Sequence, residues 1–485
     1  MLKLKEIASP FDFMEKDKFY ITTSIAYTNA LPHLGYALEL VQADVLARFN
    51  RSLGRDVFFL TGTDEHGAKI SKAAKTAGKT EKELTDSISS KFKELTEVLN
   101  VSNDDFIRTT DEVRHWPTVG KVWQTLKEKG DIYKKKYQGL YCVGCEAFVT
   151  QKDLVDGKCA IHKKEPEKIE EENYFFRLSK YSKQILEDIE AGRVSIIPEG
   201  RKNEMMSFIK QGLEDVSFSR PRKDLKWGVQ VPDDDSQTVY VWADALVNYL
   251  SALDYPEGGR FKRFWPPDIH CVGKDILRFH AVIWLGVLLS LGLELPRKIF
   301  VHGFITSDGQ KMSKSLGNVV DPFELVKKYG SDAVRYFLLR EISATEDGDF
   351  SFKKFEERYN FDLASGLGNI VARVITLSGG LKPAIKNSEL ENKIEETEKK
   401  YQEKLNEFKF SESLAIVWEL IGFCDKYIEE EKPWQKSEKQ KEVISNLLFV
   451  VEKIAGIIGS FFPKTSEKIL KQLKAGEKEN LFPRI

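Results

Sequence analysis

The chain has 485 residues, of which 41% are hydrophobic and 31% are charged. This length predicts two to four domains, and the composition excludes disordered and fibrous proteins. Its net charge of -1 gives no overall attraction to nucleic acid, so any RNA site must be a local basic surface. Apolar runs are too short for a membrane span and the N-terminus does not resemble a signal peptide, so we expect a cytoplasmic protein without a membrane partner.

The first part of the chain predicts a βαβ unit. Residues 19–25 indicate a buried strand, which a turn-rich stretch (26–35) and an amphipathic helix from about 37 to 53 follow. Residues 56–61 indicate a second strand, ending in the polar loop 62–67. This order is typical of a Rossmann-type parallel sheet, in which functional loops follow the carboxyl ends of the strands.

Residues 118–229 interrupt this pattern with short aromatic strands, a cysteine cluster and charged turns. The βα pattern returns with strands expected at 238–242, 269–272 and 299–301, and the chain becomes helical from about 321. We therefore expect an α/β fold with a Rossmann-type domain in two halves, 1–117 and 230–320. The insertion 118–229 separates the halves, and a linking region (321–355) leads to an α-helical bundle (356–485).

Four residues within the insertion have the spacing of metal ligands. Cys142 and Cys145 form one pair with two residues between them, and Cys159 and His162 form a second. Three thiolates and one imidazole at this spacing close a tetrahedral zinc site, whereas chance placement of buried thiols is the alternative. Because all four positions are filled by protein, we expect a structural zinc, one per chain.

Two further segments suit phosphate chemistry. His33 and Gly35 lie between the first strand and the first helix, where a helix N-terminus favours anions. Lys311 and Lys314 follow a turn, and lysines on a loop suit a triphosphate. Each segment alone has an ordinary alternative, a loop histidine without a role and a solvated lysine loop.

Together and in this order, the two segments resemble the paired signatures of class I aminoacyl-tRNA synthetases. Four phrases narrow the resemblance to the methionyl-tRNA synthetase family, and they occupy residues 27–36, 61–67, 241–245 and 273–276. The resemblance runs essentially end to end. It implies a ligase that activates L-methionine with ATP and magnesium to methionyl-adenylate, and then charges the 3′ end of methionine tRNA. The first signature departs from the family pattern, since its closing histidine is Tyr36 here, a phenol that does not become cationic at neutral pH.

The resemblance also assigns the substrate sites. It implies catalytic roles for His33, Gly35, Tyr36, Lys311 and Lys314. The ATP site would comprise Asn29, His33, Gly35, Glu39, Arg220, Asp275 and Lys314. The methionine site would comprise Ile25, Tyr27, Asp64, Trp242, Ala245, Tyr249, Ile276 and His280, with Asp64 holding the ammonium group. Spacings of three and four residues place Trp242, Ala245 and Tyr249 on one helix face, although such stripes are more often core than pocket.

The helical C-terminal region would read the tRNA. The family's anticodon residues correspond to Asn369, Arg373 and Trp434, and an amide, a guanidinium and an indole suit unstacked bases. On composition alone these are ordinary surface residues. The sequence ends at Ile485 without an appended domain of the oligonucleotide-binding kind, so we expect a monomer.

Two alternatives remain open. Synthetases for leucine, isoleucine or valine share the signatures but usually carry a large editing domain, and the insertion here is too small for one. An RNA-binding protein that kept the fold and lost catalysis is the second alternative, and only Tyr36 favours it.

Overall fold

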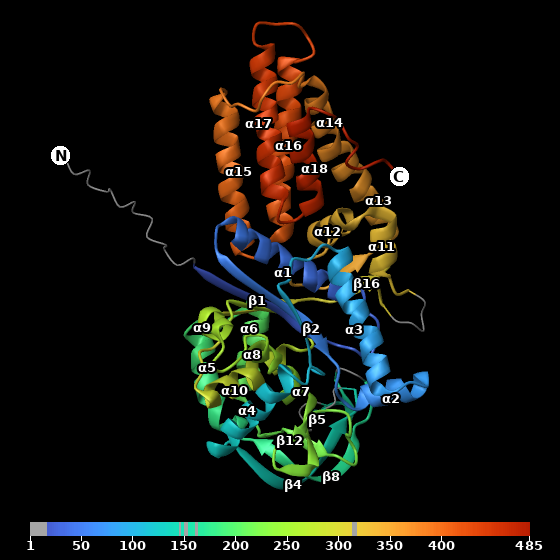
Figure 1. Ribbon diagram of the computed structural model, residues 1–485, viewed down its shortest axis with the longest axis vertical. Coiled ribbons are helices and arrows are strands. Elements are labelled where there is room, and N and C mark those ends of the chain that lie inside the picture. Colours follow the sequence, from blue (N-terminus) through green and yellow to red (C-terminus); the bar gives the residue numbers. More distant parts are fainter. Residues whose placement is uncertain (1–16, 145–146, 150–153, 161–162, 313–317) are drawn as a thin grey trace, which may run out of the picture.

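The computed structural model describes residues 17–485 apart from 145–146, 150–153, 161–162 and 313–317 (Figure 1). The molecule is elongated, with a helical bundle at one end, a parallel sheet in the middle and a small β domain at the other end. In the part of the chain that is described, every helix is too short or too polar to cross a bilayer.

The central sheet has six strands, all of them parallel, in the order β3-β2-β1-β14-β15-β9. Their bounds are β3 (Asp105–Arg108), β2 (Asp56–Asp64), β1 (Lys18–Tyr27), β14 (Ile269–Gly273), β15 (Lys298–His302) and β9 (Ser195–Ile197). This confirms the predicted parallel sheet and its strands β1, β2, β14 and β15. The strand order reverses between β1 and β14, and ligands of doubly wound sheets bind at the carboxyl ends of the strands beside such a reversal.

Strand β2 is longer than the sequence predicts. It continues through Asp64, because Asp64 pairs with Tyr27 of β1 and Thr63 pairs with Arg108 of β3. The polar residues that suggested a loop are satisfied inside the sheet layer, where Thr63 Oγ1 donates to Glu65 Oε1 at 2.7 Å. Polarity alone therefore misplaced the end of the strand.

The strand predicted at 238–242 ends earlier than expected and does not belong to the parallel sheet. Strand β13 (Asp234–Val239) pairs with β11 (Ser219–Pro221) and β12 (Gln230–Val231) in a separate antiparallel sheet. Helix α7 (Val241–Ala245) begins directly afterwards, so Trp242 lies on a helix. The partners of β13 lie directly before it in the chain, so these residues form a local antiparallel sheet and do not return to the parallel one.

Both faces of the parallel sheet are covered by helices. Phe19 and Ile21 pack on one side with helices α1 (Leu34–Ser52), α3 (Glu81–Val98) and α12 (Ser331–Arg340). Tyr20 faces the other side, where the helices are α4 (His115–Glu128), α5 (Ser182–Glu190), α6 (Glu199–Lys210), α8 (Asn248–Ser251) and α10 (Leu285–Leu291). This alternation along β1 explains why the strand is apolar on both faces.

Only part of the predicted insertion lies outside the parallel sheet. Its outer part is an antiparallel sheet of β10 (Val216–Ser217), β8 (Glu167–Phe176), β4 (Ile132–Cys142) and β5 (Ala147–Val149), with a small hairpin of β6 (Leu154–Val155) and β7 (Lys158–Cys159). Strand β9 returns from within residues 118–229 to pair with β15. Helices α5 and α6 flank β9, so they belong to the layer that covers the sheet.

The remaining elements connect these parts. Helix α2 (Ala68–Ala77) follows β2, a short 3-10 turn (Leu178–Tyr181) precedes α5, and α9 (Gly259–Phe264) precedes β14. A π-helical stretch (Phe279–Trp284) leads into α10. Strands β16 (Ile305–Ser307) and β17 (Gln310–Lys311) pair with each other, and β18 (Gly348–Phe350) joins β16. The region after 321, predicted as helical, thus begins with α11 (Pro322–Tyr329) and α12 but includes one strand.

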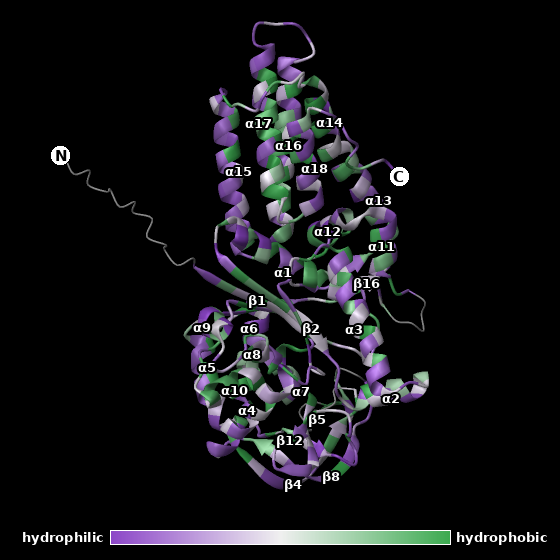
Figure 2. Cartoon of the chain, viewed as in Figure 1, coloured by the Kyte–Doolittle hydropathy of each residue, from purple (hydrophilic) through white to green (hydrophobic). Residues whose placement is uncertain are grey.

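The C-terminal bundle shares its core with the sheet domain. It contains α13 (Phe352–Arg358), a π-helical stretch (Tyr359–Leu367), α14 (Gly368–Leu377), α15 (Ser388–Asn406), α16 (Phe410–Glu431), α17 (Gln440–Ile458) and α18 (Pro463–Ala475). The outer helix α15 is largely hydrophilic along its exposed face, whereas α16 and α17 carry more apolar residues (Figure 2). One continuous apolar cluster runs from β1 through α1 and α12 into α16 and α17.

A fully buried ion pair lies where the bundle meets the sheet domain. The guanidinium of Arg335 in α12 lies 2.7 Å from Asp44 Oδ2 in α1. It also donates to the carbonyl oxygens of Phe461 at 2.6 Å, Ser460 at 3.1 Å and Leu99 at 3.2 Å. These partners belong to α1, to the segment after α3 and to the α17–α18 connection, so a single side chain joins three parts of the molecule.

Candidate active site

Tyr27 and Asp64 lie side by side at the carboxyl edge of the sheet. They are register partners at the ends of β1 and β2. The backbone N–H and hydroxyl of Thr28 both donate to the Asp64 carbonyl oxygen, at 2.9 and 3.0 Å. Asp64 is buried, and His66 N donates to its Oδ1 at 3.4 Å. The strand pairing therefore places Asp64 next to Tyr27 at this edge of the sheet.

His33 caps the first helix with its imidazole. Its Nδ1 accepts a hydrogen bond from Gly35 N at 3.1 Å, so the neutral ring carries its proton on Nε2. A Cβ at position 35 would lie 2.9 Å from His33 Cε1, which explains the glycine. Desolvation by the surrounding protein lowers the pKa of His33 despite the nearby Asp275. His33 thus presents an N–H donor at a helix N-terminus, where an anion is favoured.

Tyr36 points into the core of the protein. Its hydroxyl lies 2.8 Å from Thr61 Oγ1, and its ring meets Phe92 edge-on at a centroid distance of 4.9 Å. Burial raises the pKa of Tyr36 above its ordinary value. The resemblance gave this phenol a catalytic role, and in the structure it makes a packing contact between α1, β2 and α3. The catalytic role stays a prediction.

Glu39 has internal partners for both carboxylate oxygens. One oxygen accepts from Ser24 N at 2.8 Å and from Ser24 Oγ at 2.6 Å, and the other lies 2.8 Å from His302 Nε2. His302 Nδ1 lies 2.8 Å from the Gly303 carbonyl, so both ring nitrogens donate. Burial lowers the pKa of His302, but the bond and charge of Glu39 outweigh it and raise the net value. The sequence analysis missed His302, which links β15 to the helix bearing the first signature.

Asn29 and Asp275 follow two neighbouring strands, β1 and β14, at the carboxyl edge of the sheet. Both side chains are exposed, Asn29 in the loop after β1 and Asp275 directly after β14. A Cβ at Gly273 would lie 2.8 Å from Asp275 Oδ1, so the glycine allows the carboxylate to fold back over the strand end. Partial enclosure raises the pKa of Asp275. Two polar side chains and His33 therefore surround the end of β1.

Tyr249 and His280 form a hydrogen-bonded pair in the predicted methionine pocket. His280 Nδ1 donates to the Ile276 carbonyl at 3.0 Å, so its Nε2 accepts from the Tyr249 hydroxyl at 2.8 Å. Both side chains are fully buried. Burial lowers the pKa of His280 to about 4. The pair is therefore neutral and polar on an otherwise apolar wall.

We expect His280 to stay neutral across the physiological range. Because its folded pKa lies below the free value of about 6.5, the contribution of neutral His280 to the stability of the fold is complete above about pH 6.5 and is lost progressively as pH falls from 6.5 toward 4. ¹⁵N NMR of labelled histidine should show the Nδ1–H tautomer at pH 6, with a His280→Gln variant for assignment. An imidazolium signal from His280 at pH 6 would contradict this.

Trp242 stacks on a residue that the sequence analysis missed. Its indole lies 3.7 Å from the Phe279 ring, with 8° between the planes. Phe279 begins the π-helical stretch before α10, so the usual helical spacing does not predict which face it occupies. Ile25, Ala245 and Ile276 are half-buried or buried on β1, at the end of α7 and after β14, respectively.

A buried carboxylate holds α7 against the loop after β2. Asp244 Oδ2 lies 2.6 Å from His66 Nδ1, and Oδ1 lies 2.8 Å from His115 Nε2. Burial tends to raise the pKa of Asp244, but the two imidazoles outweigh it and lower the pKa to about 2. His66 and Asp244 belong to the family segments 61–67 and 241–245, but the sequence does not show that they contact each other. The network fixes the helix of Trp242 relative to the strand of Asp64.

Arg220 borders a cavity of about 50 Å³ between the insertion and the sheet domain. Its guanidinium pairs with Glu171 at 2.8 Å and lies 4.1 Å from the ring centroid of Tyr141. The remaining lining residues come from the start of α2, the segment after β11 and the start of α7: Gly67, Ala68, Asp224, Leu225, Tyr240 and Val241. The cavity therefore opens beside the elements that carry Asp64 and Trp242.

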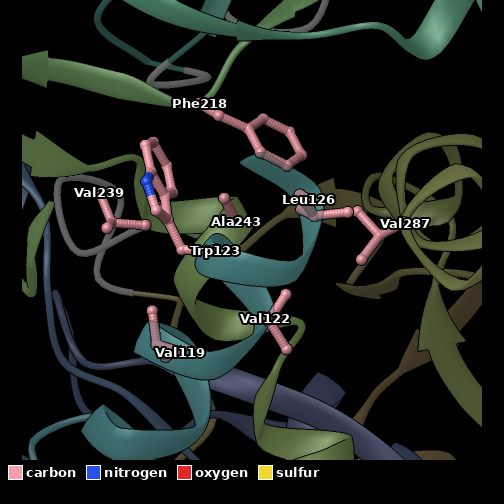
Figure 3. Close-up of a pocket in the computed structure, with 8 residues that line it drawn as sticks. All are labelled: Val119, Val122, Trp123, Leu126, Phe218, Val239, Ala243 and Val287. Carbon is pink, nitrogen blue, oxygen red and sulfur yellow. The ribbon is translucent and has the colours of Figure 1, made fainter. Parts of the chain in front are cut away.

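A second cavity is a packing defect. It measures about 10 Å³ and has an apolar lining that includes Trp123 of α4 and Phe218 (Figure 3). The other side chains around it are aliphatic, namely Val119, Val122, Leu126, Val239, Ala243 and Val287. It is too small for a substrate and none of its lining residues belongs to the predicted sites.

Hydrogen bonds to Asp349 fix the segment 306–309, directly before the lysine loop. Asp349 of β18 accepts from Gly309 N and from Thr306 Oγ1, both at 2.7 Å. The turn between them uses left-handed backbone at Asp308 and Gly309, with φ values of 49° and 73°. Lys311 closes β17, and the prediction for Lys314 falls outside the described residues.

The predicted anticodon residues lie on the bundle. Asn369 and Arg373 are one turn apart on α14, and Asn369 is exposed. Arg373 pairs with Glu429 at 2.7 Å and Asp425 at 3.4 Å on α16, two carboxylates that the sequence analysis missed. Trp434 follows the end of α16 and is 48% exposed. A large exposed indole is available for stacking.

Two of the four predicted zinc ligands are described. Cys142 and Cys159 are buried together in a small cluster with Val149, at the ends of β4 and β7. The predictions for Cys145 and His162 fall outside the described residues. Within the described ranges, no three metal-binding side chains meet.

Comparisons with known proteins agree with this geometry. Residues 19–153 and 144–375 match the family described as tRNA synthetases class I (M), and residues 387–483 match the anticodon-binding domain of tRNA ligases. The methionine–tRNA ligase of Caldanaerobacter subterraneus is 44% identical over 94% of this chain and 74% of its own length. That of Thermotoga maritima is 42% identical over 95% of this chain and 76% of its own length.

Solved structures extend the likeness to three dimensions. Mycobacterium tuberculosis methionyl-tRNA synthetase in complex with methionyl-adenylate superposes with a TM-score of 0.90 at 36% identity, covering 96% of this chain and all of that one. The free form of that enzyme gives a TM-score of 0.82 at 34% identity, covering 97% of this chain and 98% of that one. Since the family matches span the sheet domain and the bundle, the chain belongs to the methionyl-tRNA synthetases, within class I of the aminoacyl-tRNA synthetases.

Proposed function

We propose that the chain activates L-methionine with ATP and transfers the methionyl group to the 3′ end of methionine tRNA. The main support for this proposal is the neutral Tyr249–His280 pair. A methionine thioether packs well against uncharged, polarisable aromatic rings, and this pair provides them. Asp64 lies on the strand edge beside Tyr27 and supplies a carboxylate for the substrate ammonium group. Trp242, supported by Phe279, would close the apolar side.

In the first step, the methionine carboxylate attacks the α-phosphorus of ATP, with magnesium on the phosphates. Pyrophosphate leaves and methionyl-adenylate forms. The protein aligns the reactants and stabilises charge on the phosphoryl oxygens. His33 Nε2–H would donate to such an oxygen, with Gly35 giving the close approach, and Lys311 and Lys314 would neutralise the leaving group.

The ATP site would lie across the end of β1. Asn29 and Asp275 are exposed there and would contact the nucleotide. Glu39 would support the ribose site indirectly, because both of its carboxylate oxygens already have partners in Ser24 and His302. Arg220 would approach the reacting carboxylate and phosphate from the insertion side.

Pyrophosphate exchange with each amino acid in turn tests the function. Exchange that depends on methionine alone supports it. Exchange with leucine, isoleucine or valine would favour a relative with another specificity. Absence of exchange with every amino acid would favour an RNA-binding protein without catalysis.

The second step requires the helical bundle. Residues 356–485 would bind the anticodon, 321–355 would link the bundle to the Rossmann-type halves, and 118–229 would contain the zinc knuckle. We propose that the protein acts as a monomer.

We expect Trp434→Ala to separate the two steps. Loss of one stacking platform should cost about 1–3 kcal/mol of tRNA binding, because the indole is exposed and makes base contacts only in the complex. Methionine-dependent pyrophosphate exchange should hardly change, whereas charging at low tRNA concentration should fall sharply. A parallel fall in both assays would instead identify Trp434 as a folding residue.

We propose one structural zinc per chain at Cys142, Cys145, Cys159 and His162. The burial of the Cys142 and Cys159 thiols in one cluster fits thiolate ligands that a metal shields from water. When bound, the metal would hold the knuckle together. Elemental analysis should give one zinc per chain, and Cys142→Ser should lose it. A metal-free, well-folded parent protein would contradict the assignment.

A further inference from the structure

Two residues of the insertion, Tyr141 and Glu171, contact the guanidinium of Arg220. The guanidinium lies 4.1 Å from the Tyr141 ring centroid, a contact that fixes its plane. Glu171 Oε1 accepts from its Nη2 at 2.8 Å, which fixes one end of that plane. Tyr141 and Glu171 lie on the neighbouring strands β4 and β8, whereas Arg220 lies on β11. All three side chains are nearly buried, so water competes little for these contacts.

These contacts of Arg220 lie at the cavity beside the elements that carry the proposed methionine-binding residues. Tyr141 and Arg220 line it on the insertion side, and Gly67 and Val241 line it on the sheet-domain side. Gly67 lies three residues after Asp64 in the sequence, and Val241 lies directly before Trp242. Arg220 therefore lines a cavity whose opposite wall is close in sequence to Asp64 and Trp242.

We propose that Tyr141 and Glu171 are positioning residues for adenylate formation, which hold Arg220 in the orientation that the reacting carboxylate and phosphate require. This inference rests on the proposed function, in which Arg220 approaches those groups. An arginine side chain has several rotatable bonds, so a free guanidinium would sample many orientations. Misplacement of a contact group by about 1 Å can cost on the order of a hundredfold in rate.

The charge arrangement supports a positioning role. Glu171 uses its other oxygen to accept from Asn173 Nδ2 at 2.9 Å, so its carboxylate is itself fixed. Burial alone would lower the pKa of Arg220, but Tyr141 and Glu171 outweigh it and the net pKa is raised. The guanidinium therefore stays charged in a desolvated place, where its hydrogen bonds are strong.

A second contact seats the insertion on the same crevice. Lys69 Nζ donates to the carbonyl oxygen of Gly144, in the turn that follows Cys142. The same ammonium lies 5.5 Å from the ring centroid of Tyr27 in the proposed methionine pocket. The insertion thus reaches both the Arg220 side and the Tyr27 side, which fits an element that helps to assemble the site.

The test uses Tyr141→Ala, Tyr141→Phe and a matched control. We expect Tyr141→Ala to lower kcat of methionine-dependent pyrophosphate exchange at least tenfold, with less than a threefold change in KM for methionine. Tyr141→Phe keeps the ring and removes only the hydroxyl that interacts with Arg220, so its loss of kcat should be clearly smaller than that of Tyr141→Ala. Tyr133→Ala is the control, because Tyr133 on the same strand stacks on Arg177 at 4.2 Å, at the opposite end of β4. It should stay within twofold.

A double-mutant cycle decides whether Tyr141 acts through Arg220. Arg220→Ala should lower kcat strongly by itself, and adding Tyr141→Ala should then change it less than twofold. If the Tyr141→Ala protein does not fold, Glu171→Gln replaces it, with at least a threefold loss expected in the parent and none in the Arg220→Ala background.

Several outcomes would overturn the inference. They are full effects of Tyr141→Ala in the Arg220→Ala background, equal losses in Tyr133→Ala and Tyr141→Ala, or an Arg220→Ala enzyme within twofold of the parent. In each case the parent still exchanges pyrophosphate with methionine, so the proposed function stands. A parent without exchange would instead reject the proposed function, and with it the inference.

Discussion

Replacement of Lys314 by alanine is expected to slow adenylate formation by on the order of a hundredfold or more. Removing one preorganised partner of a developing charge typically costs roughly 2.7–4 kcal/mol of transition-state stabilisation. Methionine affinity should hardly change, because Asp64 and the Tyr249–His280 pair belong to other elements. Interactions made mainly in the transition state are lost in this way, with ground-state binding retained.

Pre-steady-state adenylate formation at saturating ATP and methionine measures this effect. Lys311→Ala should act in the same direction but less strongly, since the two lysines can partly replace each other. Lys328→Ala is a suitable control, because Lys328 on α11 is a surface lysine paired with Glu356. A Lys314→Ala enzyme within threefold of the parent would mean that the loop is merely solvated and would favour a protein without catalysis.

Replacement of Arg335 by methionine is expected to destabilise the protein by about 3–5 kcal/mol. Removal of one partner from a buried ion pair leaves the other charge without compensation. Here it also leaves the carbonyl oxygens of Leu99, Ser460 and Phe461 without their donor. Asp44 keeps Arg48 at 2.8 Å, so the loss should fall toward the lower end of this range.

The pH dependence of this variant follows from Asp44. Burial tends to raise its pKa, but Arg335 and Arg48 outweigh it, and the net pKa is lowered. A carboxyl with a lowered pKa stabilises the fold above its unfolded pKa, and this stability is lost as pH falls through the folded pKa. Without Arg335 the pKa of Asp44 should rise, so the variant should lose stability at a higher pH than the parent does.

Urea denaturation at neutral and acidic pH measures both effects. Arg340→Met is the matched control, since Arg340 lies at the end of the same helix, is partly exposed and donates to Ser411 Oγ at 3.0 Å. It should lose much less stability. An Arg335→Met protein as stable as this control would show that the junction does not depend on the ion pair.

The order of the parts and the family could be predicted from sequence, because they depend on local signals. Strands β1, β14 and β15 are short apolar runs, and such runs are typical of strands buried on both faces. His33 and Gly35 act through contacts within three residues, so their relation is visible in the sequence itself. The metal spacing at Cys142 and Cys159 is local in the same sense, although half of that set lies outside the described residues.

The sites themselves depend on contacts between distant segments, and these only the tertiary structure decided. Strand β9 returns from the insertion to pair with β15, about a hundred residues further along the chain, since strand pairing depends on which sheet edges remain available. The Asp244 carboxylate can stay buried because two histidines from other elements donate hydrogen bonds to it, and Arg220 is held by residues 79 and 49 positions earlier. Sequence determined which residues are present for the chemistry, whereas packing determined which of them meet, because a buried charge is stable only where distant partners compensate it.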